Sequence, residues 1–364
     1  MCSSSLILVV LVGALSELRT SHSFMVSRNP AIKTTKPQHP RIFFSIPMIL
    51  EVDHSIDPNT LSSSGAKYED VLSGLNKLYP PDELSTRNAI SRTDGYWKYI
   101  SKGEAPPPTL TYGEFDFLFF ADLIDKAIVL HNEGGGSDSI AEKTFTDIGS
   151  GTGRLVLGAA ALHPNFKLCK GLEILQGIHE NAVANLEICT NSDATKSLSF
   201  ETDEGIGELS LAPIEFSCGS FHDPYEYFGN SDLIFVFSTC FTPEMMSSLS
   251  DGIGRQCKPG TIVITTEYKL NTSGHIGPLA SDSHIPHGDY IIELVDSLDG
   301  TCWLVGGKST AHIQRVTKSL WDGTGPREKP EAWPESTALQ EAQDALQYLK
   351  GPQQLSLVEF LKSQ

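Results

Sequence analysis

The sequence predicts an α/β protein with a doubly wound, Rossmann-like sheet that follows a small helical region. Between residues 144 and 267, strand-like apolar runs alternate with segments of helical periodicity, the order expected of a parallel sheet covered by helices. Near the end come strand-like runs at 290–295, 302–305 and 310–316, with a predicted turn at 299–300 between the first two. These last runs predict an antiparallel terminal hairpin, so we expect a seven-stranded sheet.

The region before the sheet, residues 66–135, is predicted to be helical. Apolar residues recur every three or four positions over 68–78, and Pro81 suits the first turn of a second helix. A long apolar helix is expected from Phe115 to about Leu130. This region leads directly into the first strand of the sheet.

Residues 140–320 are expected to form the sheet domain. Parallel strands are predicted to end near Ile148, Glu173, Ser217, Phe237 and Glu267, with helices to about Leu162, at Gln176–Ile188 and at Pro243–Ile253. The polar segment from Thr190 to about Gly207 is predicted to be a surface excursion. The tail, 321–364, is broken by prolines and is expected to carry one short helix near 336–349.

The first fifty residues are interpreted as a targeting presequence. An apolar run at 6–15 has the length of a signal peptide and is too short to span a bilayer. No acidic residue occurs between Glu17 and Glu51, where basic residues are mixed with serine, threonine and proline. This arrangement resembles the bipartite plastid presequence of algae with secondary plastids, so plastid localisation is expected, with no membrane association of the mature form. Simple secretion and a leader without any address are the alternatives.

Composition narrows the classes of function. The chain of 364 residues has a formal net charge of −18, which is unfavourable for a protein that must hold nucleic acid by itself. Its seven cysteines are scattered without a C-x-x-C pair, which favours free thiols over a disulfide framework. The eleven histidines show no ligand spacing, so no metal site is assigned.

The run DIGSGTG from Asp147 to Gly153 carries the strongest functional signal. Gly149, Gly151 and Gly153 follow a predicted strand, and glycine lets a turn take positive φ and approach a ligand closely. Glu173 ends the next predicted strand, where a carboxylate suits the two hydroxyls of a ribose. These features predict a site for a nucleoside cofactor.

The acid inside this turn distinguishes among such cofactors. Asp147 would repel the pyrophosphate of a dinucleotide and attract a cation. S-adenosylmethionine carries both a sulfonium and an ammonium group, so it fits better and methyl transfer is the expected chemistry. Methyl transfer from a sulfonium is an in-line displacement that mainly needs positioning and shielding of the reactants.

Several motifs in order resemble one family, the disruptor-of-telomeric-silencing ("Dot-one") histone-lysine methyltransferases. Tyr112-Gly113-Glu114 resembles the family's Y-G-E, DIGSGTGRLVL from Asp147 its D-L-G-S-G-x-G-x-x-V-L, and Gly171-Leu172-Glu173 its G-x-E. Gly219-Ser220-Phe221 lies where the family has G-D-F. FVFSTCFTPE from Phe235 lies over F-V-N-N-F-A-F-G-P-E, and the likeness covers roughly residues 70–318.

The resemblance implies a class I methyltransferase fold, S-adenosylmethionine as cofactor, and a set of site residues. The implied cofactor-binding residues are Tyr112, Glu114, Asp147, Gly149, Ser150, Gly151, Gly153, Arg154, Glu173, Ser220 and Phe221. The implied catalytic residues are Tyr112, Ser238 and Trp303. Purely structural roles compete with these: a capping box for Thr111 and Glu114, a solvated side chain for Arg154, and core packing for Phe221 and Trp303.

Most of the departures from the family concern the acceptor, and one concerns the adenine of the cofactor. Phe237-Ser238 replaces the asparagine pair, Ser220 replaces the adenine-binding aspartate, and Thr310-Ala311 falls near the tyrosine pair of the lysine channel. The family's lysine-rich DNA-binding segment has no counterpart. The expected partner is therefore a protein with an accessible lysine, a histone being one option, and the case for direct nucleic-acid binding is weak. A plastid enzyme acting on a small molecule or a non-histone protein, a binding protein without catalysis, and a nuclear histone methyltransferase are the alternatives.

Overall fold

A computed structural model describes most of the chain between the expected presequence and the tail. The described residues are 56–100, 112–189, 196–202, 205–278, 285–302 and 307–328. The presequence expected at 1–50, the tail helix expected near 336–349 and Trp303 lie outside them. No helix in the described ranges is long and apolar enough to cross a bilayer.

The N-terminal region is helical, as predicted. It comprises α2 (Tyr68–Leu78), a 3-10 turn at Pro81–Glu83, α3 (Leu84–Ile100) and α4 (Phe117–Glu133). The cap of α4 is Asp116, whose side chain accepts a 2.9 Å hydrogen bond from the Phe119 amide. The capping box suggested for Glu114 is therefore wrong, because the helix begins later and the Glu114 carboxylate has other partners.

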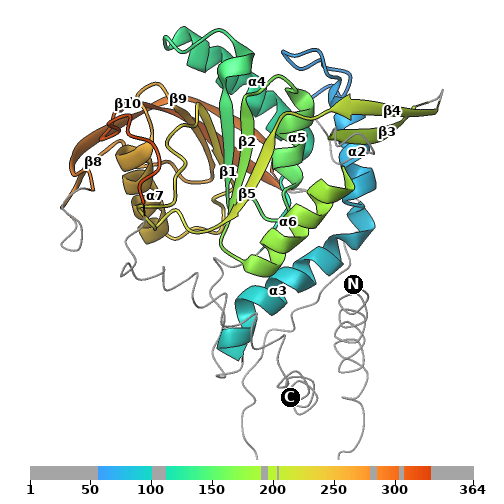
Figure 1. The fold of residues 1–364 in the computed structure, drawn as a ribbon, viewed down its shortest axis with the longest axis horizontal. Helices are drawn as coiled ribbons and strands as arrows, with labels where there is room; N and C mark the ends of the chain where they lie inside the picture. The colour runs from blue at the N-terminus through green and yellow to red at the C-terminus, as the bar shows by residue number, and fades with distance from the viewer. Residues whose placement is uncertain are drawn as a thin grey trace, which may run out of the picture. The chain divides into compact units, whose positions relative to one another are not determined.

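The main sheet has eight strands in the order β5-β2-β1-β6-β7-β10-β9-β8 (Figure 1). The first five of these are parallel: β5 (Ile214–Cys218), β2 (Leu168–Glu173), β1 (Thr144–Ile148), β6 (Leu233–Val236) and β7 (Ile262–Thr266). The remaining three are antiparallel: β10 (Lys308–Lys318), β9 (Gly288–Thr301) and β8 (Ser273–Ile276). The doubly wound sheet with an antiparallel end is confirmed.

Two details of the sheet differ from the prediction. The eighth strand, β8, is a four-residue edge strand, too short and polar for the alternation of apolar residues that reveals a strand. The turn expected at 299–300 is wrong, because β9 continues through it and Gly300 pairs with Ser309 of β10. The hairpin arms are therefore longer than the apolar pattern indicated.

The polar segment after α6 (Gln176–Ile188) forms a hairpin instead of an irregular excursion. Its strands are β3 (Ser197–Thr202) and β4 (Gly205–Ser210), which make a separate two-stranded sheet. Leu198 is 2% exposed, and a Cβ on Gly74 of α2 would lie 2.7 Å from its Cγ. The hairpin therefore gains its buried contact from the N-terminal helical region, beside which it lies in Figure 1.

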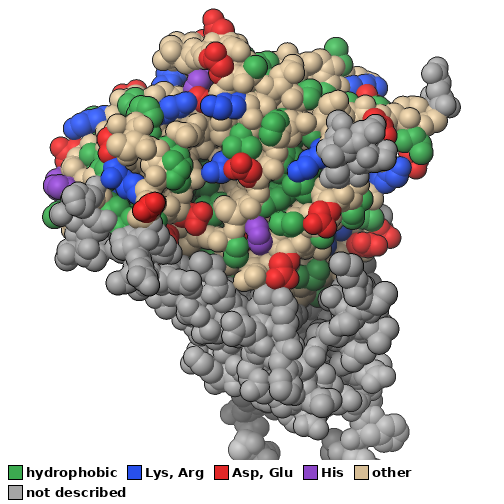
Figure 2. All heavy atoms as spheres, viewed as in Figure 1, with side chains coloured by type: hydrophobic (Ala, Val, Ile, Leu, Met, Phe, Trp, Pro, Cys, Tyr) green, Lys and Arg blue, Asp and Glu red, His purple; other side chains and the backbone are tan. Residues whose placement is uncertain are grey.

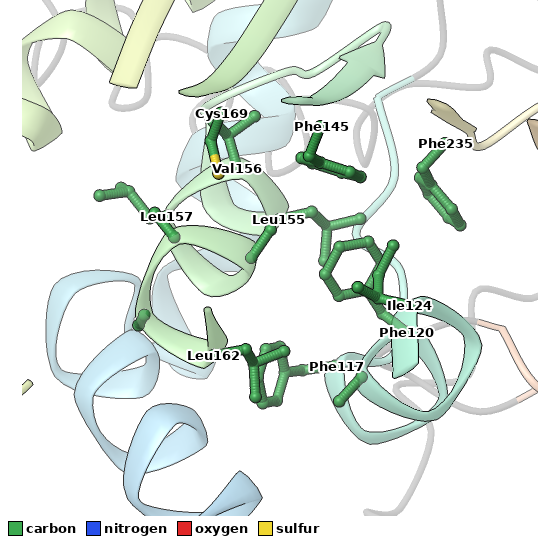
Figure 3. Packing of buried hydrophobic residues seen from close by; sticks show 14 of the residues in the cluster. Phe117, Phe120, Ile124, Phe145, Leu155, Val156, Leu157, Leu162, Cys169 and Phe235 are labelled. Carbon is green, nitrogen blue, oxygen red and sulfur yellow. The ribbon is translucent and has the colours of Figure 1, made fainter. Parts of the chain in front are cut away.

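The core lies on both faces of the sheet. One cluster joins α2, α4 and α5 (Arg154–Leu162) to one face, and the other joins α7 (Pro243–Gln256) to the opposite face. In the first cluster, drawn in Figure 3, Phe120 of α4 meets Phe145 and Phe235 edge to face, at centroid distances of 5.9 and 5.2 Å. This packing fixes α4 and α5 over β1 and β6, and so fixes the turn between β1 and α5. The six described cysteines are all unpaired, as the prediction of free thiols required.

Candidate functional site

The glycine turn joins the carboxyl end of β1 to the first residue of α5. Gly149, Gly151 and Gly153 have φ of 80°, 56° and 82°, the left-handed region that side chains disfavour. The amides of Gly149 and Ser150 donate to the Leu172 carbonyl at 2.8 and 3.1 Å, which binds the turn to β2. A Cβ on Gly151 would lie 2.6 Å from the Tyr112 ring, so only glycine lets this tyrosine close over the turn.

Two buried carboxylates lie at this turn. Asp147 and Glu173 are 3% and 7% exposed. Glu173 accepts hydrogen bonds from the Gly151 amide at 2.8 Å and the Leu175 amide at 2.9 Å, whereas no polar partner of the Asp147 side chain is found in the described ranges. Burial, with a further contribution from the charge of Glu173, raises the pKa of Asp147 to about 8. A cation placed here would stabilise the ionised form of Asp147.

A hydrogen-bonded network connects the Y-G-E segment to the turn. The Tyr112 hydroxyl donates to Glu114 Oε1 and lies 2.9 Å from Thr152 Oγ1 within the turn. Glu114 is 5% exposed and forms a bidentate ion pair with Arg87 of α3, at 2.5 and 3.1 Å. Charge-assisted bidentate pairs of this kind fix geometry as well as adding energy. The N-terminal helical region therefore holds Tyr112 in place over the glycine turn.

Two buried polar side chains at the site still have unused hydrogen-bonding atoms. The guanidinium of Arg154 is 4% exposed and donates from Nη1 to the Phe115 carbonyl. Its Nε and Nη2 have no hydrogen-bond partner, although Nε lies 3.8 Å from Glu114 Oε2. The hydroxyl of Ser150 is likewise buried and unpartnered. Since buried polar groups are rarely left unsatisfied, these atoms could bind a polar ligand.

The residues after β6 form the neighbouring edge of the sheet. The Ser238 hydroxyl donates to the Thr266 carbonyl at 2.7 Å and accepts from the Thr266 amide at 3.1 Å, so the structure commits it to joining β6 and β7. The expectation that this hydroxyl faces a reacting centre does not fit that geometry. Phe237 packs edge to face on Phe115, with centroids 5.1 Å apart.

The Gly-Ser-Phe segment follows β5 and lies beside the same edge. Phe221 is 9% exposed and stacks on Phe241, with centroids 5.7 Å apart and planes 22° apart. Ser220 is 3% exposed and its Oγ accepts from the His222 amide at 3.3 Å. Both residues are thus held by neighbours from this loop and from the segment after β6.

The structure brings most of the predicted site residues together around the turn between β1 and α5. Sequence reasoning missed Arg87 and Thr152, which connect that turn to the Y-G-E segment. Arg87 is 27 residues from Glu114, and no local pattern relates the two. Thr152 lies inside the DIGSGTG run, but only its contact with Tyr112 distinguishes it from other residues of the turn.

Residues 106–276 match the family model described as "Histone methylation protein DOT1". Over these residues the chain is similar to the Dot-one family. It is an S-adenosylmethionine-dependent methyltransferase of the class I fold, and the resemblance read from its motifs is confirmed. The matched residues contain the Y-G-E segment, the glycine turn, Glu173 and the segment after β6.

Solved structures similar to this chain come from distant proteins. An RNA methyltransferase from Salinibacter ruber, in complex with S-adenosyl-L-homocysteine, is 18% identical, with 59% of this chain and 97% of that chain covered and a TM-score of 0.32. PKMT2 from Rickettsia typhi, in complex with AdoHcy, is 15% identical over 40% of this chain and 25% of that chain, with a TM-score of 0.30. A SAM-dependent methyltransferase from Methanosarcina mazei is 13% identical over 49% and 94%, with a TM-score of 0.33. Comparison with curated protein sequences gives no match.

The site at the glycine turn fits S-adenosylmethionine chemically. S-adenosylmethionine has a sulfonium, an ammonium, a carboxylate and a ribose, and the site has an unpaired buried carboxylate, a second carboxylate, unused guanidinium donors and a free hydroxyl. Within the described ranges, no cluster of histidine, cysteine, aspartate or glutamate has the arrangement of a metal site.

Proposed function

We propose that this Dot-one methyltransferase transfers a methyl group to the ε-amine of a lysine in a protein. The observation that carries the proposal is the buried network of Arg87, Glu114, Tyr112 and Thr152, which closes the family's Y-G-E segment over the glycine turn. The matched family is described as "Histone methylation protein DOT1". A lysine of a histone or of another protein is therefore the acceptor that we propose first.

Each chemical group of the cofactor has a suitable partner in this proposal. Asp147 would bind the ammonium group and Glu173 the ribose hydroxyls, since carboxylates accept from both. Arg154 would bind the methionine carboxylate through its unused donors, and Ser150 would add a hydroxyl. Tyr112, with Glu114 beneath it, would cover the methionine end.

The other proposed contacts come from the loop after β5 and the turn itself. Ser220 and Phe221 would border the adenine, and Gly149, Gly151 and Gly153 would let the backbone approach the methionine end closely. When bound, S-adenosylmethionine supplies an electrophilic methyl group. The protein positions that group and excludes water, which is most of what an in-line displacement requires.

The acceptor edge of this protein is apolar. Phe237 packs on Phe115, and Phe241 stacks on Phe221, at the edge where the family has its asparagine pair. An apolar approach suits the alkyl stem of lysine and favours the neutral amine, because burial lowers the pKa of an ammonium. Trp303, which lies outside the described residues, is proposed as a further aromatic at the acceptor.

We do not propose that this protein holds nucleosomal DNA directly. The chain has a net charge of −18, and on the face drawn in Figure 2 the described Lys and Arg side chains are interspersed with Asp and Glu. This surface fits a protein acceptor that the enzyme can bind without also binding DNA better than it fits nucleosomal DNA.

The acceptor is tested with methyl-labelled S-adenosylmethionine and four substrates: nucleosomes, free histones, plastid protein extract and plastid small molecules. We expect label on lysine of free histone or of a plastid protein, and loss of label in Glu173→Gln. Label on small molecules alone would contradict the protein acceptor, and cofactor binding without label on any substrate would favour a binding protein that lacks catalysis.

Plastid localisation is a separate proposal that rests on the acid-free, basic leader. A fluorescent protein fused after residue 364 leaves the N-terminus intact. Fluorescence in the plastid is expected, and fluorescence in the nucleus would contradict the proposal and favour histones as the acceptor.

A further inference from the structure

A cavity of about 550 Å³ lies at the opposite edge of the sheet from the glycine turn. Its lining comes from the end of α4, the glycine loop after it, and residues next to the amino ends of the parallel strands. Lys143 precedes β1 and Asp232 precedes β6, whereas the glycine turn follows the carboxyl end of β1. The five residues of β1 separate the two sites by roughly 16 Å, at about 3.3 Å per residue.

The one buried acid in this cavity is already neutralised. Asp232 accepts hydrogen bonds from Lys258 Nζ at 2.6 Å, the Thr144 amide at 2.8 Å and His131 Nε2 at 3.3 Å. Burial raises the pKa of Asp232, but these donors outweigh burial and hold it at about 2. The charge of Lys258 therefore balances that of Asp232.

Lys143 is a buried cation that contacts only neutral groups. The residue is 0% exposed, and its ammonium donates to the Ser137 carbonyl and to His131 Nδ1. An ammonium has no lone pair to offer, so His131 Nδ1 is the acceptor and its proton is on Nε2, facing Asp232. Burial lowers the pKa of Lys143, as expected of a cation without a direct carboxylate partner.

Arg315 supplies a second cation with unused capacity. Its Nη2 donates to the Leu130 carbonyl at 2.6 Å, in the last turn of α4, and its Nε is buried without a partner. Glu142 is the other acid lining the cavity, and it is exposed and accepts from the Ser137 hydroxyl. The cavity therefore holds a positive charge in excess of its acids.

The glycine loop is shaped around these cationic side chains. A Cβ on Gly134 would lie 2.7 Å from Arg315 Nε, and a Cβ on Gly136 would lie 2.1 Å from the His131 ring. At both positions a Cβ would force the neighbouring side chain to move, so the two glycines let the loop approach these side chains closely. The loop thus makes room for a guanidinium whose Nε has no hydrogen-bond partner, and for the histidine that accepts from a buried ammonium. Such an arrangement is typical of an anion-binding site.

We propose that this cavity binds a small molecule through a phosphate group, with Arg315 as the direct ligand of the phosphate and Lys143 as a buried positive charge beside it. A phosphate oxyanion would offset the excess positive charge, and its oxygens would accept from the guanidinium of Arg315, which is partly exposed. Lys143 is fully buried and would act through its charge. The site is separate from the methyl-transfer site and does not depend on the proposed function.

The test measures binding of pyrophosphate and inorganic phosphate to the full chain by titration calorimetry, with citrate and chloride at equal ionic strength as comparison anions. We expect one saturable phosphate site per chain. Arg315→Gln should weaken binding about tenfold or more. Arg255→Gln is the matched control, because Arg255 also has a buried Nε without a partner but lies on α7 away from this cavity.

Three results would overturn the proposal: no binding to the unaltered protein, equal binding by Arg315→Gln, or equal binding of citrate and phosphate in every variant. S-adenosylmethionine affinity, measured in parallel, reports whether a variant has folded. If Arg315→Gln loses that affinity as well, Arg315→Lys keeps the charge and should bind phosphate several-fold more weakly than the unaltered protein.

Discussion

Replacing Arg87 by methionine tests the coupling between the N-terminal helices and the cofactor site. The substitution keeps an apolar stem but leaves the Glu114 carboxylate, 5% exposed, without its bidentate partner. Breaking a buried ion pair in this way costs about 3–5 kcal/mol. Arg154 lies 3.8 Å from the same carboxylate, so the expected loss is at the lower end, about 3 kcal/mol. Because Glu114 also holds Tyr112, the affinity for S-adenosylmethionine should fall about tenfold.

Urea denaturation and calorimetric titration with S-adenosylmethionine measure the two effects. Lys126→Met is the control, because it removes an ion pair with Asp296 in which both side chains are 37% exposed, worth at most about 1 kcal/mol. The double variant Arg87→Met with Glu114→Gln should recover part of the lost stability, since no charge is then left unpaired by Arg87. A loss below about 1 kcal/mol, with unchanged cofactor affinity, would refute the coupling.

Three further predictions concern single residues of the site. The pKa of Asp147 is about 8 in the folded protein against 3.8 as its ordinary value, so its contribution to stability falls as pH rises through that window. Binding a cationic cofactor favours the ionised form of Asp147, so near pH 7 cofactor binding should release a proton and should strengthen with pH up to about 8. Calorimetry in two buffers measures the proton release. Equal release by Asp147→Asn would contradict this prediction. Gly151→Ala places a Cβ 2.6 Å from Tyr112 at a φ of 56°, so both stability and cofactor affinity should fall, by about 1–3 kcal/mol for stability; an unchanged denaturation midpoint would count against the close approach. Ser238→Ala should cost about 1–3 kcal/mol of stability with kcat kept, because two backbone groups of Thr266 lose their partner; the reverse result would give Ser238 a role in the chemistry.

The sequence was sufficient for the parallel part of the fold, because alternating strands and helices leave patterns in adjacent residues. It failed where pairing is decided by distant partners. The β3–β4 hairpin is polar, and it is stabilised by packing Leu198 against α2, which nothing local to 197–210 indicates. Likewise β8 forms because β9 offers an edge, although β8 has little strand pattern of its own.

The same distinction holds for the site. The residues of the glycine turn and Glu173 could be predicted, since their spacing reflects one βαβ unit. The partner of Glu114 could not, because Arg87 lies on a different helix and only the tertiary fold brings the two together. The bonds of the Ser238 hydroxyl to Thr266 of β7 could not be predicted for a related reason, since they depend on the register between β6 and β7.

The central claim is that Glu173, at the end of β2, holds S-adenosylmethionine beside the glycine turn. The most direct test is the dissociation constant of the cofactor for the unaltered chain, for Glu173→Gln, and for Glu187→Gln as an exposed control on α6. We predict a loss of affinity of about tenfold or more for Glu173→Gln and none for the control. Equal affinities in all three proteins would contradict the account, because the cofactor would then be held without the carboxylate that defines the site.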